Sequence, residues 1–233
     1  MAERIAWLVV LAEDLNQASF AYRYLREKKH HPRTIRVRLP EKGRGAGEQY
    51  VRKKYPEEVR EYRSRRYQSG LLVVLVDADM ESVPEREHDL NTALETAGED
   101  QREPEEAIAL LIPKRHIETW ILCLQGERVD EATDYRRRRD IQQKIKPAAQ
   151  TFHEWSPPNY PVPAHCVDSP RRGLREARRI PSSCSRLFGS SHANGPARTP
   201  AMMGDAAGGM SRCRFQPPLF SQGAASVGSR ATR

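Results

Sequence analysis

Three uninterrupted apolar runs stand out along the first half of the chain. They cover residues 5–12, 71–76 and 107–112. Continuous apolar runs of this length are typical of parallel strands that are covered by helices on both faces. A fourth segment, residues 34–39, alternates polar and apolar side chains, which predicts a strand with one face in water at an edge of the sheet.

Segments with helical spacing of apolar residues separate these runs. We expect helices over residues 15–29, 48–66 and 84–97, followed by a fourth that contains residues 117–122. Asn16 is the expected N-terminal cap of the first helix. Strands that alternate with helices of this length predict βαβ crossovers. The predicted fold class is therefore α/β, with a mostly parallel sheet of four or more strands and helices on both faces.

Composition divides the chain into three parts. Residues 1–126 carry the α/β pattern, and residues 127–181 predict a small helical extension with short helices at 147–155 and 169–180. Residues 182–233 contain no Lys, Glu, Ile, Trp or Tyr and are dominated by Gly, Ala, Ser, Pro and Arg. Such a segment cannot bury enough apolar surface to offset its ordering entropy, so we predict a disordered tail. Its composition equally resembles out-of-frame translation of a GC-rich gene.

The formal net charge of the whole chain is +8, but most of it comes from the tail. Residues 182–233 hold six Arg and one Asp, a net charge of +5, which leaves +3 for residues 1–181. A strongly basic domain suggests a phosphate-binding surface. Because the predicted folded part is only mildly basic, its net charge does not decide between nucleic acid and other partners.

No stretch approaches the roughly 20 consecutive apolar residues that a membrane-spanning helix needs. The chain enters its first predicted strand within a few residues and shows no signal peptide. Its four cysteines have no CxxC spacing, which favours unpaired thiols in a reducing compartment over a zinc site or a disulfide framework. We expect a soluble, cytoplasmic protein without a membrane partner.

Two acidic clusters lie where buried strands are predicted to end. Glu13 and Asp14 follow the first apolar run, and Asp77 and Asp79 follow the second. The crevice outside the carboxyl ends of parallel strands is where ligands bind in open α/β sheets. Carboxylates that converge there repel one another unless a hard cation such as Mg²⁺ lies between them. We therefore predict that Asp77 and Asp79 bind a metal and that the site carries out metal-dependent phosphoryl transfer.

The segment after the last buried strand adds one carboxylate and two cations to this crevice. Glu118 would lie where a phosphate and its metals bind, while Lys114 and Arg115 would stabilise the charge that develops during phosphodiester cleavage. Structural alternatives exist for these charges. Glu118 could form an intrahelical salt bridge with Arg115, and Glu13 could serve only to charge the first turn of its helix.

A glycine-rich loop precedes the second predicted helix. Lys42 and Arg44 lie in this loop, and Arg52 and Lys53 follow it. These cations form a candidate nucleic-acid contact, because glycines let backbone amides approach a phosphate closely. A flexible surface loop before a solvated helix is an equally good interpretation. A later basic run, residues 136–139, is more typical of a solvated helix face than of a DNA contact.

In their α/β context, these acidic positions resemble the catalytic domain of the Toprim family, which occurs in topoisomerases, bacterial primases, OLD-type nucleases and related phage-defence proteins. The resemblance rests on Glu13, the Asp77-x-Asp79 motif and the segment Ile117-Glu118-x-Trp120. The last of these is similar to a signature of small Toprim-like families. The resemblance covers roughly residues 5–125, about half of the chain.

The resemblance implies a Toprim/Rossmann-like fold and a metal-dependent nuclease that acts in defence against foreign DNA. Glu13 would act as general acid/base or assist metal binding. Asp77 and Asp79 would hold Mg²⁺ or Mn²⁺, and Glu118 would add a ligand. Nucleic acid is the partner that the resemblance implies.

Two departures from the family pattern leave open a remodelled or inactive site. Asp14 stands where many Toprim proteins have Gly, and Gln17 stands where related defence proteins often have a second acid. A non-catalytic Toprim-like module that binds nucleic acid or a partner ATPase is one alternative. A receiver-like phosphoacceptor domain is another, since it would use acids after the first strand, an Asp such as Asp77 and a Lys such as Lys114.

Overall fold

The computed structural model of the chain describes residues 5–41, 47–65 and 68–182. Lys42 and Arg44 of the predicted nucleic-acid contact lie outside these ranges, as do residues 183–233 of the predicted tail. Within the described ranges, no helix is both long enough and apolar enough to span a membrane.

A four-stranded parallel sheet forms the centre of the described structure. Its strands are β1 (Trp7–Ala12), β2 (Ile35–Arg38), β3 (Gly70–Leu75) and β4 (Ile108–Leu111). They lie in the order β2-β1-β3-β4, and every neighbouring pair is parallel. In this register, Leu8 of β1 lies opposite both Ile35 of β2 and Leu71 of β3. The sheet confirms the predicted α/β class, and β2 is the predicted edge strand.

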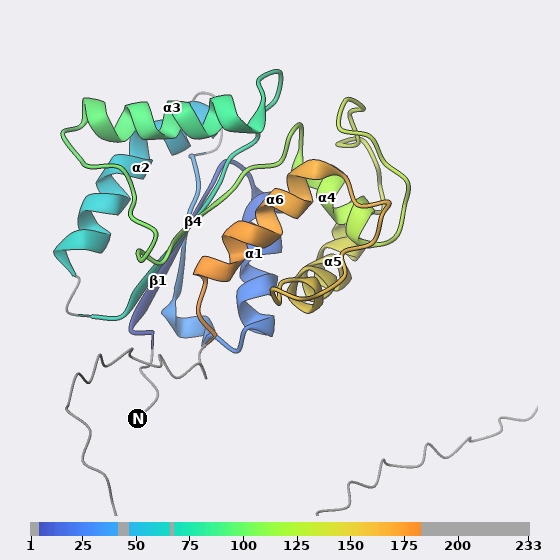
Figure 1. Cartoon of the computed structure of the whole chain (residues 1–233), viewed down its shortest axis with the longest axis horizontal. Coiled ribbons are helices and arrows are strands. Elements are labelled where there is room, and N and C mark those ends of the chain that lie inside the picture. The colour runs from blue at the N-terminus through green and yellow to red at the C-terminus, as the bar shows by residue number, and fades with distance from the viewer. Residues whose placement is uncertain (1–4, 42–46, 66–67, 183–233) are drawn as a thin grey trace, which may run out of the picture. The chain divides into compact units, whose positions relative to one another are not determined.

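Helices cover both faces of this sheet. They are α1 (Leu15–Glu27), α2 (Gly47–Ser64), α3 (Val83–Thr96), α4 (Ile117–Leu124), α5 (Ile141–Trp155) and α6 (Asp168–Glu176), with the short 3-10 helices η1 (Pro32–Thr34) and η2 (Ala177–Arg179). Helices α2 and α3 pack on one face, while α1, α4, α5 and α6 pack on the other (Figure 1). The predicted arrangement of helices on both faces is therefore confirmed.

Two hydrophobic clusters result, because successive side chains of a strand point to opposite faces. Leu8 belongs to the cluster under α1, whereas its neighbour Val9 belongs to the cluster under α2. Aromatic rings hold the first cluster together: Phe152 of α5 lies 5.4 Å from Phe20 of α1 and 5.7 Å from Trp120 of α4 between ring centroids. Helix α4 is thus packed against both α1 and α5.

The outer edge of β4 is covered by charged side chains. Glu176 of α6 accepts the backbone N–H of Leu110 at 3.2 Å, and Arg102 donates to the carbonyl oxygen of Ile108 at 3.1 Å. Arg102 and Glu176 also pair with each other at 2.5 Å. These bonds satisfy backbone groups that an edge strand would otherwise expose, and they bring α6 against the sheet.

The expected cap of α1 is wrong by two residues. Asp14 is the cap: its backbone is extended, and its Oδ1 accepts the backbone N–H of Gln17 at 2.8 Å. Asn16 already lies inside the helix. A carboxylate at the cap position can accept this bond and also interacts favourably with the positive end of the helix dipole.

The second half of the chain differs from expectation in two places. Helix α5 begins at Ile141, so Pro147 lies inside it rather than at its start. Ile141, Ile145 and Phe152 are all buried on one stripe, and burying this stripe offsets the cost of about 3 kcal/mol that an internal proline imposes. Residues 136–139 form turns and not the expected helix face.

Gly173 of α6 provides a test of how closely α6 packs on α4. A Cβ at this position would lie 2.1 Å from the ring of Trp120, which is fully buried. Gly→Ala normally stabilises a helix by about 1 kcal/mol, but here overpacking should outweigh that gain. We expect Gly173→Ala to lower the free energy of unfolding by about 1–3 kcal/mol, measured by urea denaturation.

Arg175→Ala is the matched control, because it places the same residue on an exposed position of α6. It should leave the free energy of unfolding within about 0.5 kcal/mol of the wild type. A Gly173→Ala variant that is as stable as this control would show that α6 does not pack on Trp120 in this way.

Candidate active site

Adjacent strands β1 and β3 send their following helices to opposite faces of the sheet (Figure 1). Such a switch point opens a crevice at the carboxyl ends of the two strands. Glu13 and Asp14 directly follow β1, and Asp77 and Asp79 follow β3. The topology therefore brings both acidic clusters to the same crevice.

Hydrogen bonds join the two clusters directly. Oε2 of Glu13 accepts the backbone N–H of Asp77 at 3.0 Å. Gln17, a fully buried residue of α1, accepts the backbone N–H of Glu13 at 3.0 Å and donates from Nε2 to Oδ1 of Asp77 at 2.8 Å. Gln17 is therefore part of the site, and its neutral amide can donate to Asp77 where an ionised acid could not.

Arg86 of α3 holds the segment after β3 in place. Its Nε donates to the carbonyl oxygen of Asp77 at 3.1 Å. Its guanidinium also pairs with Glu48 at 2.7 Å, Glu81 at 3.2 Å and Asp89 at 3.3 Å. The Arg86 side chain is only 7% exposed, whereas its three carboxylate partners are 20–46% exposed. Nothing in the sequence pattern pointed to this residue.

Asp79 presents the exposed carboxylate of the site. Its side chain is 47% exposed, against 6% for Asp77. The backbone of Asp79 has a φ of 53°, a left-handed conformation that few residues other than glycine adopt. The backbone N–H of Ala78 donates to the carbonyl oxygen of Pro113 at 2.8 Å, which ties this turn to the segment after β4. Asp79 is thus held toward solvent beside a buried carboxylate.

Glu118 approaches the crevice from the first turn of α4. It is 3% exposed, and its Oε1 accepts a hydrogen bond from Nδ2 of Asn16 at 2.7 Å. The alternative of an intrahelical salt bridge with Arg115 is not what the structure has: Arg115 directs Nη1 toward the sulfur of Met80 at 3.5 Å. Asn16, expected as a cap, therefore positions an acidic side chain instead.

His116 is a site residue to which the sequence analysis gave no role. It is the N-terminal cap residue of α4 and is 3% exposed. Its Nδ1 lies 3.4 Å from Oδ2 of Asp77 and 3.9 Å from Oδ1 of Asp79. Its Nε2 has no hydrogen-bond partner among the described residues and lies 3.8 Å from Oδ1 of Asp134. Its position two residues before Glu118 was the feature of the sequence that could have indicated a place in the site.

Burial perturbs the titration of these groups. Burial raises the pKa of Asp77 well above its ordinary value, and the nearby charges of Glu13 and Asp14 raise it further. Burial also raises the pKa of Glu13 and of Glu118, in both cases with help from neighbouring acids. For His116, burial lowers the pKa, which favours the neutral imidazole.

The donor atoms of this site suit a hard divalent cation. Glu13, Asp77, Asp79 and Glu118 supply carboxylate oxygens, which Mg²⁺ prefers. Within the described part of the chain, no group of three or more His, Cys, Asp or Glu side chains is arranged to hold a metal. Mg²⁺ is usually bound through one or two carboxylates, with water and substrate phosphates completing its shell. Asp77 and Asp79 supply two such carboxylates, and an oxygen of each lies within 4 Å of Nδ1 of His116.

Lys114 and Arg115, the two predicted catalytic cations, make their hydrogen bonds away from the two site aspartates. Nζ of Lys114 donates to the carbonyl oxygen of Glu81, and Lys114 lines a pocket with α6. No ion pair or hydrogen bond joins Lys114 or Arg115 to Asp77 or Asp79 among the described residues. A different cation, Arg136, is close enough to affect the titration of the site groups.

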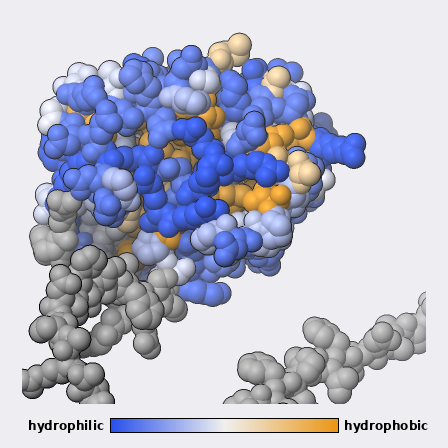
Figure 2. All heavy atoms as spheres, in the orientation of Figure 1, coloured by the Kyte–Doolittle hydropathy of each residue, from blue (hydrophilic) through white to orange (hydrophobic). Residues whose placement is uncertain are grey.

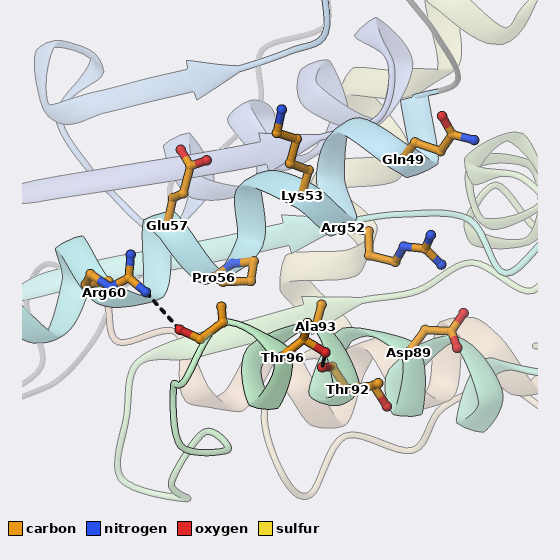
Figure 3. A pocket seen from close by; sticks show the side chains of 11 residues that line it. Gln49, Arg52, Lys53, Pro56, Glu57, Arg60, Asp89, Thr92, Ala93 and Thr96 are labelled. Carbon is orange, nitrogen blue, oxygen red and sulfur yellow. Dashed lines mark hydrogen bonds between the residues drawn. The ribbon is translucent and has the colours of Figure 1, made fainter.

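The other predicted nucleic-acid residues lie along α2. Arg52 and Lys53 line a groove of about 690 Å³ between α2 and α3 (Figure 3). Arg52 faces Glu48 at 3.9 Å, while the side chain of Lys53 points away from α3 in Figure 3. Glu57 and Asp89 line the same groove, so its basic character is partly offset.

The glycine-rich loop reaches the acidic crevice at its last residue. A Cβ on Gly47, the first residue of α2, would lie 2.3 Å from Cγ of Glu13 and 2.7 Å from its carbonyl oxygen. Only glycine permits this approach without displacing Glu13. The N-terminus of α2 therefore lies beside the Glu13 carboxylate, where the helix dipole favours negative charge.

Fold and site together describe a doubly wound parallel α/β protein with a carboxylate-rich crevice at its switch point. Comparison with protein-family models, with curated proteins and with solved structures found no match to this chain.

The raised pKa of Asp77 leads to a prediction about stability. A carboxyl group whose pKa is raised on folding stabilises the folded state fully below its unfolded pKa, here 3.8, and this contribution is lost as pH rises through the folded pKa. Asp77→Asn removes the buried charge and can still accept from Gln17. In metal-free buffer at pH 7, we expect it to raise the free energy of unfolding by about 1–2 kcal/mol.

Thermal and urea denaturation between pH 4 and 8 would measure this effect. Asp79→Asn is the matched control, because Asp79 is half-exposed and should contribute a smaller change. If Asp77→Asn were less stable than the wild type at pH 7, with the same pH dependence, the buried charge at Asp77 would not be the source of strain.

Proposed function

We propose that this chain is a metal-dependent enzyme of phosphodiester chemistry on nucleic acid, most simply a Toprim-like nuclease that acts in the cytoplasm against foreign DNA. The observation that carries the proposal is the convergence of Glu13, Asp77, Asp79 and Glu118 from three separate connections onto one switch point. Carboxylates whose mutual repulsion raises their pKa values gain stability when a cation binds between them.

Some side chains of the crevice would bind the metal, and Glu13 would transfer the proton. Asp77, fixed by Gln17, and the exposed Asp79 would hold Mg²⁺ or Mn²⁺. Glu118, held by Asn16, would add a ligand. When bound, the cation would polarise the scissile phosphate and lower the pKa of a coordinated water.

Glu13 is the candidate general acid/base. Its pKa is raised by burial and by the charges of Asp79 and Asp14. A carboxyl group with a raised pKa can exchange a proton nearer neutral pH than an ordinary glutamate does. The backbone N–H of Asp77 donates to its carboxylate, and Gly47 at the start of α2 lies against its Cγ.

A receiver-like phosphoacceptor draws less support from this arrangement. The Asp77 side chain is 6% exposed, and Gln17 donates to one of its oxygens. Lys114, the residue that would contact a phosphorylated Asp77, donates to the backbone of Glu81. Both features hinder transfer of a phosphoryl group to Asp77.

Metal binding is the first test of the proposal. At a Mg²⁺ or Mn²⁺ concentration ten times the dissociation constant, the free energy of unfolding of the wild type should rise by about 1.4 kcal/mol. Asp79→Asn should abolish this rise, because Asp79 is the exposed ligand. Glu105→Gln, an equivalent change at an exposed position before β4, should preserve it.

Cleavage is the second test. A labelled single- or double-stranded DNA or RNA should be cut in the presence of Mg²⁺ or Mn²⁺, and Asp79→Asn should slow cutting by about 100-fold or more. Metal binding at Asp79 with no cleavage of any of the four substrates would favour a non-catalytic module that binds nucleic acid or a partner ATPase. If the folded wild type neither binds the metal nor cleaves any of these substrates, the proposal is overturned.

A further inference from the structure

A basic pocket lies between α6 and the start of α3. It has a volume of about 380 Å³, and its charged lining comprises Lys114, Glu131, Asp168, Arg171, Arg172 and Arg175. Helix α6 crosses the front of the molecule in Figure 1, and strongly hydrophilic side chains gather over it in Figure 2. Four of the six charged residues that line this pocket are cations, which suits an anionic ligand.

Two of these cations are engaged in holding the fold. Arg171 donates to the carbonyl oxygens of Cys166 at 2.7 Å and Pro163 at 2.6 Å. Arg172 pairs with Glu87 of α3. These contacts fix the wall of the pocket, and they leave recognition of a ligand mainly to the other two cations.

Lys114 and Arg175 have no carboxylate partner among the described residues. Arg175 is exposed on α6. Nζ of Lys114 is held by a single backbone oxygen, that of Glu81. A hydrogen bond from an ammonium group to one carbonyl leaves its other two donors available. The two side chains thus offer a point charge and a planar fork, the two groups that proteins use most to bind phosphate oxygens.

Two sets of contacts connect the elements that line this pocket with those that carry the acidic side chains. Nε1 of Trp120 in α4 donates to Oγ of Ser169 in α6 at 2.8 Å, and Gly173 allows close contact with the Trp120 ring. The backbone N–H of Ala78, between the two site aspartates, donates to the carbonyl oxygen of Pro113 at 2.8 Å. Lys114 is the next residue in the chain. The segment that is bonded to the aspartate turn therefore leads directly into the lining of the pocket.

We propose that the pocket of Lys114 and Arg175 binds a backbone phosphate of the nucleic-acid strand whose neighbouring phosphodiester lies at the acidic crevice. The inference deepens the proposed function and rests on it for the choice of substrate. An acidic crevice by itself repels a polyanion, so a fixed cationic subsite nearby is needed to hold the strand. Lys114, expected from the sequence to act in catalysis, serves here in positioning the substrate.

The test measures binding separately from cleavage. Fluorescence anisotropy with a labelled 20-nucleotide single-stranded DNA is recorded for the full chain in EDTA, where no metal-dependent cutting occurs. Lys114→Gln/Arg175→Gln should weaken binding by about 10-fold or more and reduce the slope of log affinity against log salt by about 1 to 2. Unchanged melting temperatures would confirm that the variant is folded.

Arg23→Gln/Lys146→Gln is the matched control. It removes two exposed positive charges from the α1 and α5 side of the molecule, so it corrects for the loss of net charge alone. It should change the affinity by less than about 3-fold. Equal losses in the two double variants, or none in either, would overturn the inference.

Two outcomes separate this inference from the proposed function. If the DNA binds through Lys114 and Arg175 but Mg²⁺ neither binds at Asp79 nor supports cutting, the pocket is a phosphate subsite and the nuclease proposal fails. If the wild type cuts DNA and Lys114→Gln/Arg175→Gln binds and cuts it equally well, the nuclease proposal stands and the pocket is not the subsite.

Discussion

Three hydrogen bonds among Glu13, Gln17 and Asp77 hold the carboxyl ends of β1 and β3 together, and the rest of the site depends on them. They bring Glu13 and Asp77 together at the switch point, where the helices that follow β1 and β3 go to opposite faces of the sheet. Like charges in a buried place are unfavourable, so the chain supplies neutral or backbone donors between them. The result is an acidic crevice that is ordered without being neutralised.

Arg86 and Asn16 extend this arrangement outward. Arg86 binds the backbone of Asp77 and three surrounding acids, so the segment after β3 is fixed from the α3 side. Asn16 fixes Glu118 from the α1 side. Neither residue neutralises Asp79, which keeps its exposed carboxylate. The side chains that hold these segments in place are thus different from the carboxylate that faces solvent.

Trp120 links this acidic site to the basic side of the molecule. It lies in the same short helix as Glu118 and His116, and it contacts α6 through Ser169 and Gly173. Helix α6 in turn covers the β4 edge through Glu176. A helix that the sequence suggested only as part of a small extension therefore covers the edge of the sheet and lines the basic pocket.

The hydrophobic pattern by itself determined the strands, most of the helices and the parallel sheet, because burial on two faces leaves a continuous apolar run in the sequence. The ends of these runs also located the acids that follow β1 and β3. Only the tertiary structure decided that Gln17, Asn16 and His116 contact those acids, since their partners lie 39 or more residues away in the chain. Arg86 is nine residues from Asp77, but no local pattern records a contact across the turn between a strand and a helix. The same holds for α5, where burial of Ile141 and Ile145 outweighs the local preference of Pro147. Lys114 shows the limit most clearly: its charge was evident from the sequence, but its bond to the carbonyl oxygen of Glu81, 33 residues away in the chain, was not.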